Sequence, residues 1–280
     1  MRDASSRLLA NSRVSHSSLP GTVPMNESNR TVHGLWIGSN LSRLELLTLC
    51  SFAHHGHEFN LWTYSDIHCQ LPRGVRLRDA AEILPADYVF KRSTIDVECG
   101  VGSGSCAGFS DLFRYKLLYE HGGYWVDMDV TCLKPLDFAE PYLFRSHRLG
   151  AVGNVMKCPS RSRLMEMTYK RAARDLREDG DWHFGNRALS ETVRELGLSR
   201  FVRSDISNAD LWNGHVRDFI ERDAPIPDNF YVIHWLHECW RTLSSTGGFY
   251  KGLKMTGDVP DKNHARPFTT LAKLYEKYSL

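Results

Sequence analysis

Hydrophobic and polar positions along this 280-residue chain predict strands that alternate with helices. Residues 31–37 and 58–64 are short, mainly apolar runs of strand length. Between them, residues 42–56 carry apolar side chains at helical spacing. Ser42 and Glu45 stand at the start of this segment in the spacing of a capping box. A strand, a helix and a second strand in this order favour an α/β fold with a parallel sheet.

The stretch 110–135 predicts a helix, a tight turn and another strand. Ser110 is typical of a helix N-cap, and apolar residues follow it at helical spacing. Gly122 and Gly123 supply the positive-φ stop at which such a helix ends. Residues 124–126 are then a short apolar strand. Further strands are predicted at 75–78, 149–157 and 231–233, and outer helices at 161–178 and 271–278.

Asp127 and Asp129 follow the predicted strand 124–126 directly. In an extended backbone, residues two apart point to the same side, so the two carboxylates are expected to share one face. Mg²⁺ and Mn²⁺ prefer oxygen ligands, and such an ion can hold a diphosphate and neutralise the charge of a leaving phosphate. Two acids in a solvated loop would show the same spacing. The preceding strand, and Asp111 and Arg114 on one face of the preceding helix, favour the metal site.

Three segments together resemble one known family. SDLFRYKLLYEHGGYWVDMDV (110–130) resembles the signature of the DXD-containing glycosyltransferases, which include bacterial capsule and lipopolysaccharide glycosyltransferases and yeast outer-chain mannosyltransferases. Residues 33–66 resemble the first strand, helix and second strand of that family, and YVIHWLHECWR (231–241) resembles its C-terminal, histidine-containing segment. The resemblance implies an α/β fold of GT-A type, a Rossmann-like mixed sheet flanked by helices, as a single domain over residues 30–280.

The resemblance also implies a reaction and a set of site residues. The reaction is metal-dependent transfer of a hexose, with retention, from a nucleotide-diphosphate sugar to a saccharide or lipid-linked acceptor, as in polysaccharide biosynthesis. UDP-hexose is the first expected donor and GDP-mannose the second. Mn²⁺ or Mg²⁺ would be held by Asp127, Asp129 and His234, and the catalytic residues would be Asp127, Asp129 and Asp111. The residues implied at the donor are Trp36, Asp111, Arg114, Tyr115, Gly123, Asp127, Asn154 and Trp235.

Some of these assignments have alternatives. Trp36 could be a buried strand aromatic, and His234 a buried histidine that donates to a carbonyl. Two departures from the family pattern bear on donor specificity: Gly185-Asn186 stands where the family has Gly-Pro, and Trp235-Leu236 reverses the usual order. The competing functions are a secreted effector that glycosylates a host protein and a catalytically inactive sugar-nucleotide binding protein.

Composition narrows the class of protein. A net charge of +2 argues against a nucleic-acid protein that binds through bulk charge. Seven cysteines without a C-x-x-C pair are typical of free thiols in a reducing compartment. Apolar runs are all too short for a transmembrane segment. The free thiols favour a cytoplasmic location, and the resemblance implies a bacterial enzyme with peripheral contact at the inner membrane.

Three polar segments carry weaker signals. Residues 1–29, rich in serine, asparagine and arginine, predict a disordered N-terminal tail or, alternatively, an export signal. The glycine-rich run 100–108 lacks the Lys-Ser/Thr of a phosphate-binding loop and predicts a flexible loop beside the cleft. Residues 243–264 predict another loop that could close over the donor.

Overall fold

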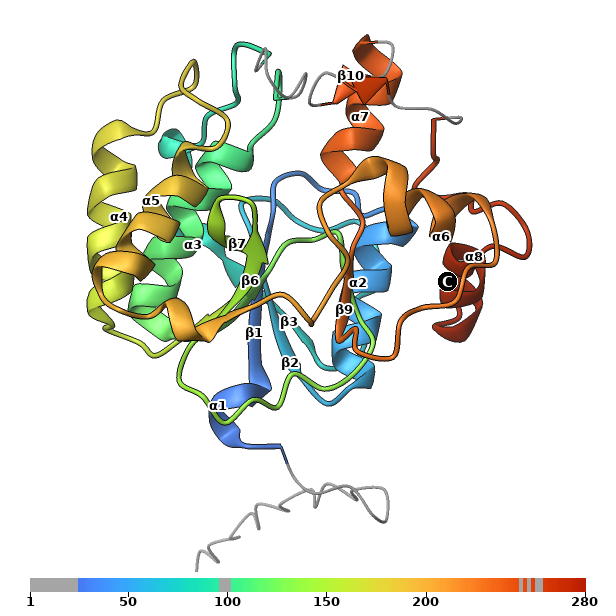
Figure 1. Cartoon of the computed structure of the whole chain (residues 1–280), viewed down its shortest axis with the longest axis horizontal. Coiled ribbons are helices and arrows are strands. Elements are labelled where there is room, and N and C mark those ends of the chain that lie inside the picture. Colours follow the sequence, from blue (N-terminus) through green and yellow to red (C-terminus); the bar gives the residue numbers. More distant parts are fainter. Residues whose placement is uncertain (1–24, 96–101, 247–248, 251–252, 255–258) are drawn as a thin grey trace, which may run out of the picture.

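A computed structural model describes residues 25–95, 102–246, 249–250, 253–254 and 259–280. Its centre is a seven-stranded sheet in the order β3-β2-β1-β4-β7-β6-β8 (Figure 1). The first four of these strands run parallel, β7 and β6 form antiparallel pairs beside β4, and β8 lies parallel to β6. The strands of the sheet are β1 (Thr31–Trp36), β2 (Glu58–Thr63), β3 (Val75–Asp79), β4 (Gly123–Val126), β6 (Leu143–His147), β7 (Gly150–Cys158) and β8 (Val202–Arg203).

Helices cover both faces of this sheet, with α3, α4 and α5 on one side and α2, α6 and α8 on the other (Figure 1). The helices are α1 (Glu27–Arg30), α2 (Arg43–His54), α3 (Ala107–His121), α4 (Arg163–Asp175), α5 (Phe184–Glu195), α6 (Arg217–Glu221), α7 (His237–Thr246) and α8 (Thr270–Lys277). Two small antiparallel pairs complete the fold: β5 (Val130–Cys132) with β9 (Val232–His234), and β10 (Phe249–Tyr250) with β11 (Leu253–Lys254). The α/β fold predicted from the sequence, a mixed sheet flanked by helices, is confirmed.

The central strands are apolar on both faces because both faces are covered. In β4, Trp125 packs into the core under α3, α4 and α5, whereas its neighbours Tyr124 and Val126 pack into the core on the side of α2. This is the period-two alternation of a strand. Parallel strands buried on both faces read as continuous hydrophobic runs, which is the pattern that predicted them.

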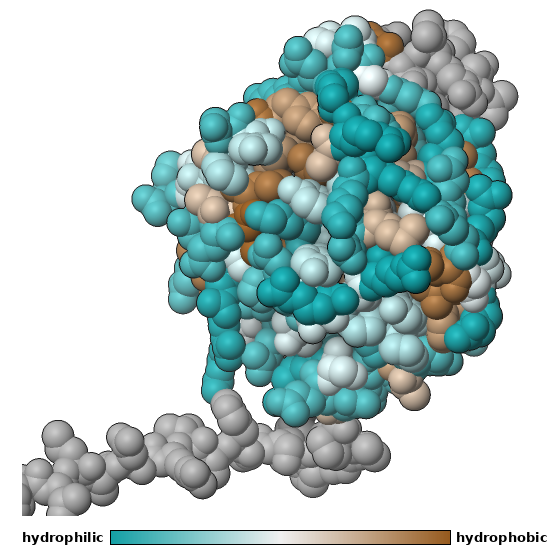
Figure 2. Space-filling model, turned by 90° about the vertical axis from the view of Figure 1, so that its left-hand side faces the viewer, coloured by the Kyte–Doolittle hydropathy of each residue, from teal (hydrophilic) through white to brown (hydrophobic). Residues whose placement is uncertain are grey.

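The outer surface of α4 is solvated, as its charged sequence predicts. Its buried residues, among them Leu164 and Ala172, lie on one side of the helix, and α4 packs against α3. Figure 2 shows this side of the molecule with polar residues over much of it and hydrophobic atoms in separate patches. None of the described helices is long and apolar enough to cross a membrane.

Helix α3 begins earlier than the sequence predicts. Its N-cap is Cys106, whereas Ser110, the predicted cap, lies inside the helix and accepts a hydrogen bond from Nη2 of Arg114 at 3.0 Å. Packing explains the shift: Phe109 is fully buried, and a Cβ on Gly108 would lie 3.2 Å from the ring of Phe90. This buried contact favours helix over the preference of serine for a cap. The predicted end of the helix at Gly122, where φ is +68°, is confirmed.

The polar segments differ from expectation in part. Residues 1–24 of the predicted tail lie outside the described residues, and the described part of the domain begins before the predicted boundary at residue 30. There Asn29 is buried and donates to Asp137 and to the carbonyl of Phe138. The predicted loop 243–264 begins within α7 and includes the β10–β11 pair. The rest of that prediction at 247–248, 251–252 and 255–258 lies outside the described residues. So do residues 100–101 of the other predicted loop, whose last two residues, 107–108, belong to α3.

Candidate active site

A cavity of about 330 Å³ opens where β1 and β4 end. Ligands in open α/β sheets collect at this carboxyl edge. Apolar and polar side chains both line the cavity, and polar groups that converge in a concave site are usual for small-molecule binding. Predicted site residues that line it are Trp36, Asp111, Arg114, Asp127, Asp129, Asn154 and His234.

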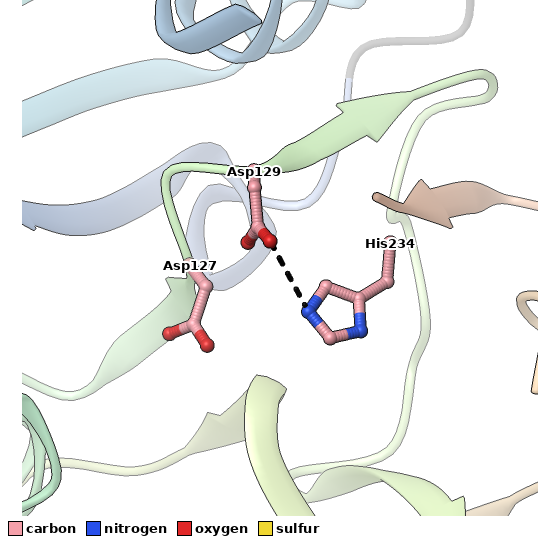
Figure 3. A group of neighbouring side chains, drawn as sticks. All are labelled: Asp127, Asp129 and His234. Atoms are coloured by element: carbon pink, nitrogen blue, oxygen red, sulfur yellow. Dashed lines mark ion pairs between the residues drawn. The ribbon is translucent and has the colours of Figure 1, made fainter. Parts of the chain in front are cut away.

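Asp127, Asp129 and His234 converge on one point of the cavity wall. One ligand atom from each lies within 4.8 Å of the others, and Nε2 of His234 lies 3.5 Å from Oδ2 of Asp129 (Figure 3). The β5–β9 pair produces this approach, because Val130 lies opposite His234 in the ladder. The amide of Trp235 also donates to the carbonyl of Asp129 at 2.9 Å.

The two aspartates converge through a turn, and the extended backbone predicted for them is wrong. Met128 and Asp129 occupy a turn between β4 and β5. The hydroxyl of Thr48 on α2 donates to the carbonyl of Met128 at 2.9 Å, and the Met128 side chain is buried in the core on the α2 side. A Cβ on Gly34 would lie 2.9 Å from the sulfur of Met128. The close packing of this turn fixes the direction of both carboxylates.

Asp127 is anchored through one of its two oxygens. Nε1 of Trp125 donates to Oδ1 at 2.8 Å, and Nη2 of Arg114 lies 3.0 Å from the same atom. The guanidinium of Arg114 also stacks over the Trp125 ring, 5.0 Å from its centroid. Since both contacts use Oδ1, the other carboxylate oxygen, Oδ2, can serve a ligand.

Asp111 is a buried carboxyl beside Arg114, with 3.4 Å between its Oδ1 and Nη1 of the guanidinium. Burial raises the pKa of Asp111 to about 6, although the charge of Arg114 opposes the shift. Gly185, in the first turn of α5, leaves the space that this carboxyl occupies. Helix α5 forms although Asn186 stands where the family has proline. Asn186 lines the cavity, and its Oδ1 accepts a hydrogen bond from the Gly153 amide at 3.0 Å.

His234 is enclosed by acids. Nδ1 of its ring lies 2.9 Å from Oδ1 of Asp210, which itself pairs with Arg145. Burial alone would lower the pKa of His234, but the carboxylates of Asp129 and Asp210 outweigh it and raise that pKa. Burial would likewise raise the pKa of Asp210, and the charges of Arg145 and His234 hold it well below its usual value.

The chain turns sharply after His234. Leu236 adopts a φ of +55°, which is uncommon for a residue with a branched side chain. This turn points the amide of His237 at Oδ2 of Asp129, to which it donates at 2.8 Å. Burial, followed by the charge of Lys262, lowers the pKa of the His237 ring to about 4. The His237 ring in the cavity wall is therefore neutral at physiological pH.

Three of the residues implied at the donor do not line the cavity. Tyr115 is fully buried, and its hydroxyl donates to the carbonyl of Gly185 at 3.0 Å. Trp235 is also fully buried, and its Nε1 donates to the hydroxyl of Thr131 at 2.8 Å. Gly123 begins β4, at the opposite end of that strand from Asp127. The placement of these three residues at the donor is corrected: they lie outside the wall of the cavity.

Other cavity residues were missed by the sequence analysis. Among them, Asp210 bonds to His234, the amide of His237 donates to Asp129, and Asn186 accepts from the amide of Gly153. Of these, only Asn186 had a signal, as part of the departure from Gly-Pro. Asp210 lies between β8 and α6, where no periodicity marks it.

The chemistry of the converging residues fits a divalent cation. Two carboxylates and one imidazole are an acceptable ligand set for Mn²⁺, and the carboxylates alone suit Mg²⁺. Asn154 adds a further polar group: the residue is 7% exposed, one end of its side-chain amide lies 3.0 Å from Nδ1 of His234, and the other end has no hydrogen-bond partner among the described residues. A buried polar group without a partner costs free energy, which a bound ligand that pairs with it would recover.

Comparison with known proteins finds a family match in the segment that carries three of the acidic site residues. Residues 105–146, which include Asp111, Asp127 and Asp129, match the family model described as the glycosyltransferase sugar-binding region containing DXD motif. Among solved structures, the chain is similar to "PaToxG Glycosyltransferase", with 14% identity and a TM-score of 0.43 over 62% of this chain and 69% of that one. It is also similar to a structure titled "Structure of Transferase", with 11% identity and a TM-score of 0.39 over 60% and 84%. No match was found among curated protein sequences.

Proposed function

We propose that this chain, a DXD-containing glycosyltransferase, transfers a hexose from a nucleotide-diphosphate sugar to a hydroxyl acceptor and uses Mn²⁺ or Mg²⁺. UDP-hexose is the first donor to test and GDP-mannose the second. The acceptor is a saccharide or a lipid-linked glycan, and the reaction retains the configuration of the anomeric carbon. The observation that carries the proposal is the convergence of Asp127, Asp129 and His234 on the wall of the cavity.

Each polar residue of the cavity has a part in binding the donor. When bound, a divalent cation would supply positive charge at the diphosphate and stabilise it as a leaving group. Asp127 and Asp129 would each offer a carboxylate oxygen to the ion, and His234 would offer Nε2. Trp36, at the end of β1 in the cavity wall, would stack on the nucleotide base.

The sugar would lie toward α3 and β7. Asp111 and Asn154 line this part of the cavity; the Asp111 carboxylate can accept hydrogen bonds from sugar hydroxyls, and the end of the Asn154 amide that faces away from His234 can bond to them too. Arg114 is held between Asp111 and Asp127, so it orients both acids and keeps their charges compensated. These contacts would fix the orientation of the sugar relative to its diphosphate.

The proposed bond exchange requires neither a nucleophile nor a base from the protein. The bond from the anomeric carbon to the leaving phosphate oxygen breaks, and the acceptor oxygen forms the new glycosidic bond on the same face. The acceptor proton passes to the leaving phosphate, which balances the charge without a protein nucleophile. The part of the chain in the cavity wall supplies positioning and electrostatic stabilisation.

The test is release of free nucleotide from a panel of UDP- and GDP-sugars with Mn²⁺. Asp129→Ala removes a carboxylate from the proposed site, and a chelator removes the ion. Asp205→Asn is a matched control, because Asp205 is an exposed acid that pairs with Arg203 away from the cavity. We expect one donor to be hydrolysed by wild type and Asp205→Asn, and activity to fall at least ~100-fold in Asp129→Ala and with chelator.

If the enzyme needs its acceptor for turnover, no donor will be hydrolysed in this assay. Calorimetry then measures the binding of each donor in the presence of Mn²⁺. Donor binding that depends on Mn²⁺ and on Asp129 would support the proposed site even without hydrolysis. Binding without turnover in the presence of any acceptor would favour an inactive sugar-nucleotide binding protein. If no donor is hydrolysed and no donor binds, the proposal is contradicted.

A further inference from the structure

His234 is held in place by buried polar side chains outside the set implied by the sequence. Asn208, 2% exposed, bonds to both backbone groups of His234. Its Oδ1 accepts the His234 amide proton at 2.9 Å, and its Nδ2 donates to the His234 carbonyl, also at 2.9 Å. Because two hydrogen bonds from one side chain fix both groups, the backbone of His234 has a defined position before any ligand binds.

The ring of His234 is fixed by Asp210. Oδ1 of Asp210 lies 2.9 Å from Nδ1 of the ring. Arg145, which is 2% exposed, forms a bidentate ion pair with the same carboxylate. Its Nη2 lies 2.7 Å from Oδ1 and its Nη1 lies 2.9 Å from Oδ2. A bidentate pair of this kind sets the direction of the carboxylate as well as its distance.

This arrangement decides which ring nitrogen carries the proton. An ionised carboxylate can only accept hydrogen bonds, so the ring must present a protonated Nδ1 to Asp210. The amide of Asn154 also lies 3.0 Å from Nδ1. Its oxygen and nitrogen have nearly the same shape, and turning the amide places a second acceptor beside that proton. Nε2, which faces Asp129 at 3.5 Å, can then offer a lone pair when the ring is neutral.

We propose that Asp210, clamped by Arg145, is a positioning residue that keeps the His234 proton on Nδ1 and directs Nε2 toward the space between Asp127 and Asp129. The inference rests on the proposed function, because it takes His234 as a ligand of the divalent ion. Carboxylates that accept from the far nitrogen of a ligating histidine fix its tautomer and raise its basicity. Asp210 itself need not contact the ion.

The first readout is binding of Mn²⁺ alone, followed through the electron paramagnetic resonance signal of free Mn²⁺. The variants are Asp210→Asn, Asp129→Ala and the control Asp205→Asn. Since loss of such an outer partner typically weakens metal binding about 10–100-fold, we expect that loss in Asp210→Asn and none in Asp205→Asn. The double variant Arg145→Met/Asp210→Asn removes both buried charges together and serves if the single variant does not fold, because it leaves no unpaired guanidinium.

The second readout reports the ring directly. Two-bond ¹H–¹⁵N spectra of histidine-labelled protein with Mg²⁺ distinguish the Nδ1–H and Nε2–H tautomers. The chain has 13 histidines, so His234 is assigned as the signal missing from His234→Gln. We expect the Nδ1–H form in wild type and a shift toward Nε2–H in Asp210→Asn. A merely structural role for Asp210 would change stability without changing this tautomer.

The outcomes separate the two proposals. If wild type binds no Mn²⁺, or if Asp129→Ala binds as well as wild type, the metal site of the proposed function is wrong. If wild type binds through Asp129, but Asp210→Asn binds within twofold of it and keeps the same His234 signals, the positioning role of Asp210 is overturned while the metal site stands. Weaker binding together with the tautomer shift supports the role.

Discussion

Gly185 on α5 is the residue whose lack of a side chain admits the carboxyl of Asp111 on α3. A Cβ built on Gly185 would lie 2.1 Å from Oδ2 of Asp111 and 2.6 Å from its Cγ. The hydroxyl of Tyr115 donates to the Gly185 carbonyl and holds the two helices at this separation. The contact explains why a glycine stands at this point even though the proline that follows it in the family is absent here.

Gly185→Ala should therefore push Asp111 out of place. We expect it to lower the free energy of unfolding by about 1–3 kcal/mol, as overpacking of a core does, and to weaken donor turnover. Gly214→Ala is the matched control, because its nearest neighbour would lie at an ordinary 3.8 Å. Chemical denaturation measures both variants. Equal stability of Gly185→Ala and wild type would contradict the contact.

The pH dependence of stability should carry the signature of Asp111. Its pKa in the folded protein, about 6, lies above its ordinary value of 3.8. Between those values the folded state binds more protons than the unfolded state, so the free energy of unfolding falls as pH rises from about 4 to about 6. The upper bound is about 3 kcal/mol, at about 1.36 kcal/mol for each pKa unit.

Denaturation curves for wild type and Asp111→Asn across pH 4–7 test this expectation. The amide does not titrate in this range, so the difference between the two proteins isolates the carboxyl. We expect Asp111→Asn to gain stability relative to wild type as the pH rises. A constant difference across the range would show that the buried carboxyl does not take up its proton in that window.

Trp36 should contribute to the affinity for the nucleotide. Its ring lines the cavity, and the ammonium of Lys262 lies 5.3 Å from its centroid. Stacking of a base on an aromatic side chain contributes about 1–3 kcal/mol, so Trp36→Ala should weaken UDP binding roughly 5–150-fold. Trp36→Phe should keep part of that affinity. Calorimetry with UDP and Mn²⁺ decides it, and unchanged affinity in Trp36→Ala would place the base elsewhere.

Substitution of Trp235, in contrast to that of Trp36, should lower stability and leave UDP affinity unchanged. It is fully buried beside Phe219 and bonds to Thr131, so Trp235→Phe removes core volume and one buried hydrogen bond. We expect the free energy of unfolding to fall by roughly 1–3 kcal/mol and UDP affinity to stay within twofold. A selective loss of affinity at unchanged stability would return Trp235 to the donor site.

The sequence pattern predicts the site residues that lie within the single segment 110–130. Asp127 and Asp129 follow a buried strand, and the helix before it places Asp111 beside Arg114; all four line the same cavity. The direction of Trp235 could have been predicted as well. His234 ends a strand, so its neighbour would point to the opposite side by the same alternation that was applied to the aspartates.

The remaining errors have a different physical origin. Asp210 and Asn208 bond to His234, and Arg145 pairs with Asp210, through long-range contacts that no local pattern encodes. Ser110 has the preference of an N-cap, but the burial of Phe109 extends α3 past it. Tertiary packing, which depends on residues far along the chain, determines both the partners of His234 and the start of α3. Local sequence preference does not predict the first and predicts the second wrongly.

The pairing of β5 with β9 also bears on how the protein is made. Asp129 and His234 stand 105 residues apart (234 − 129). At about 5–20 residues per second, a ribosome exposes the imidazole roughly 5–20 s after the second carboxylate. During that interval β5 has no partner strand and the two acids have no histidine beside them. The nascent chain therefore carries an open strand edge, and two acids without their histidine, until β9 emerges and pairs with β5.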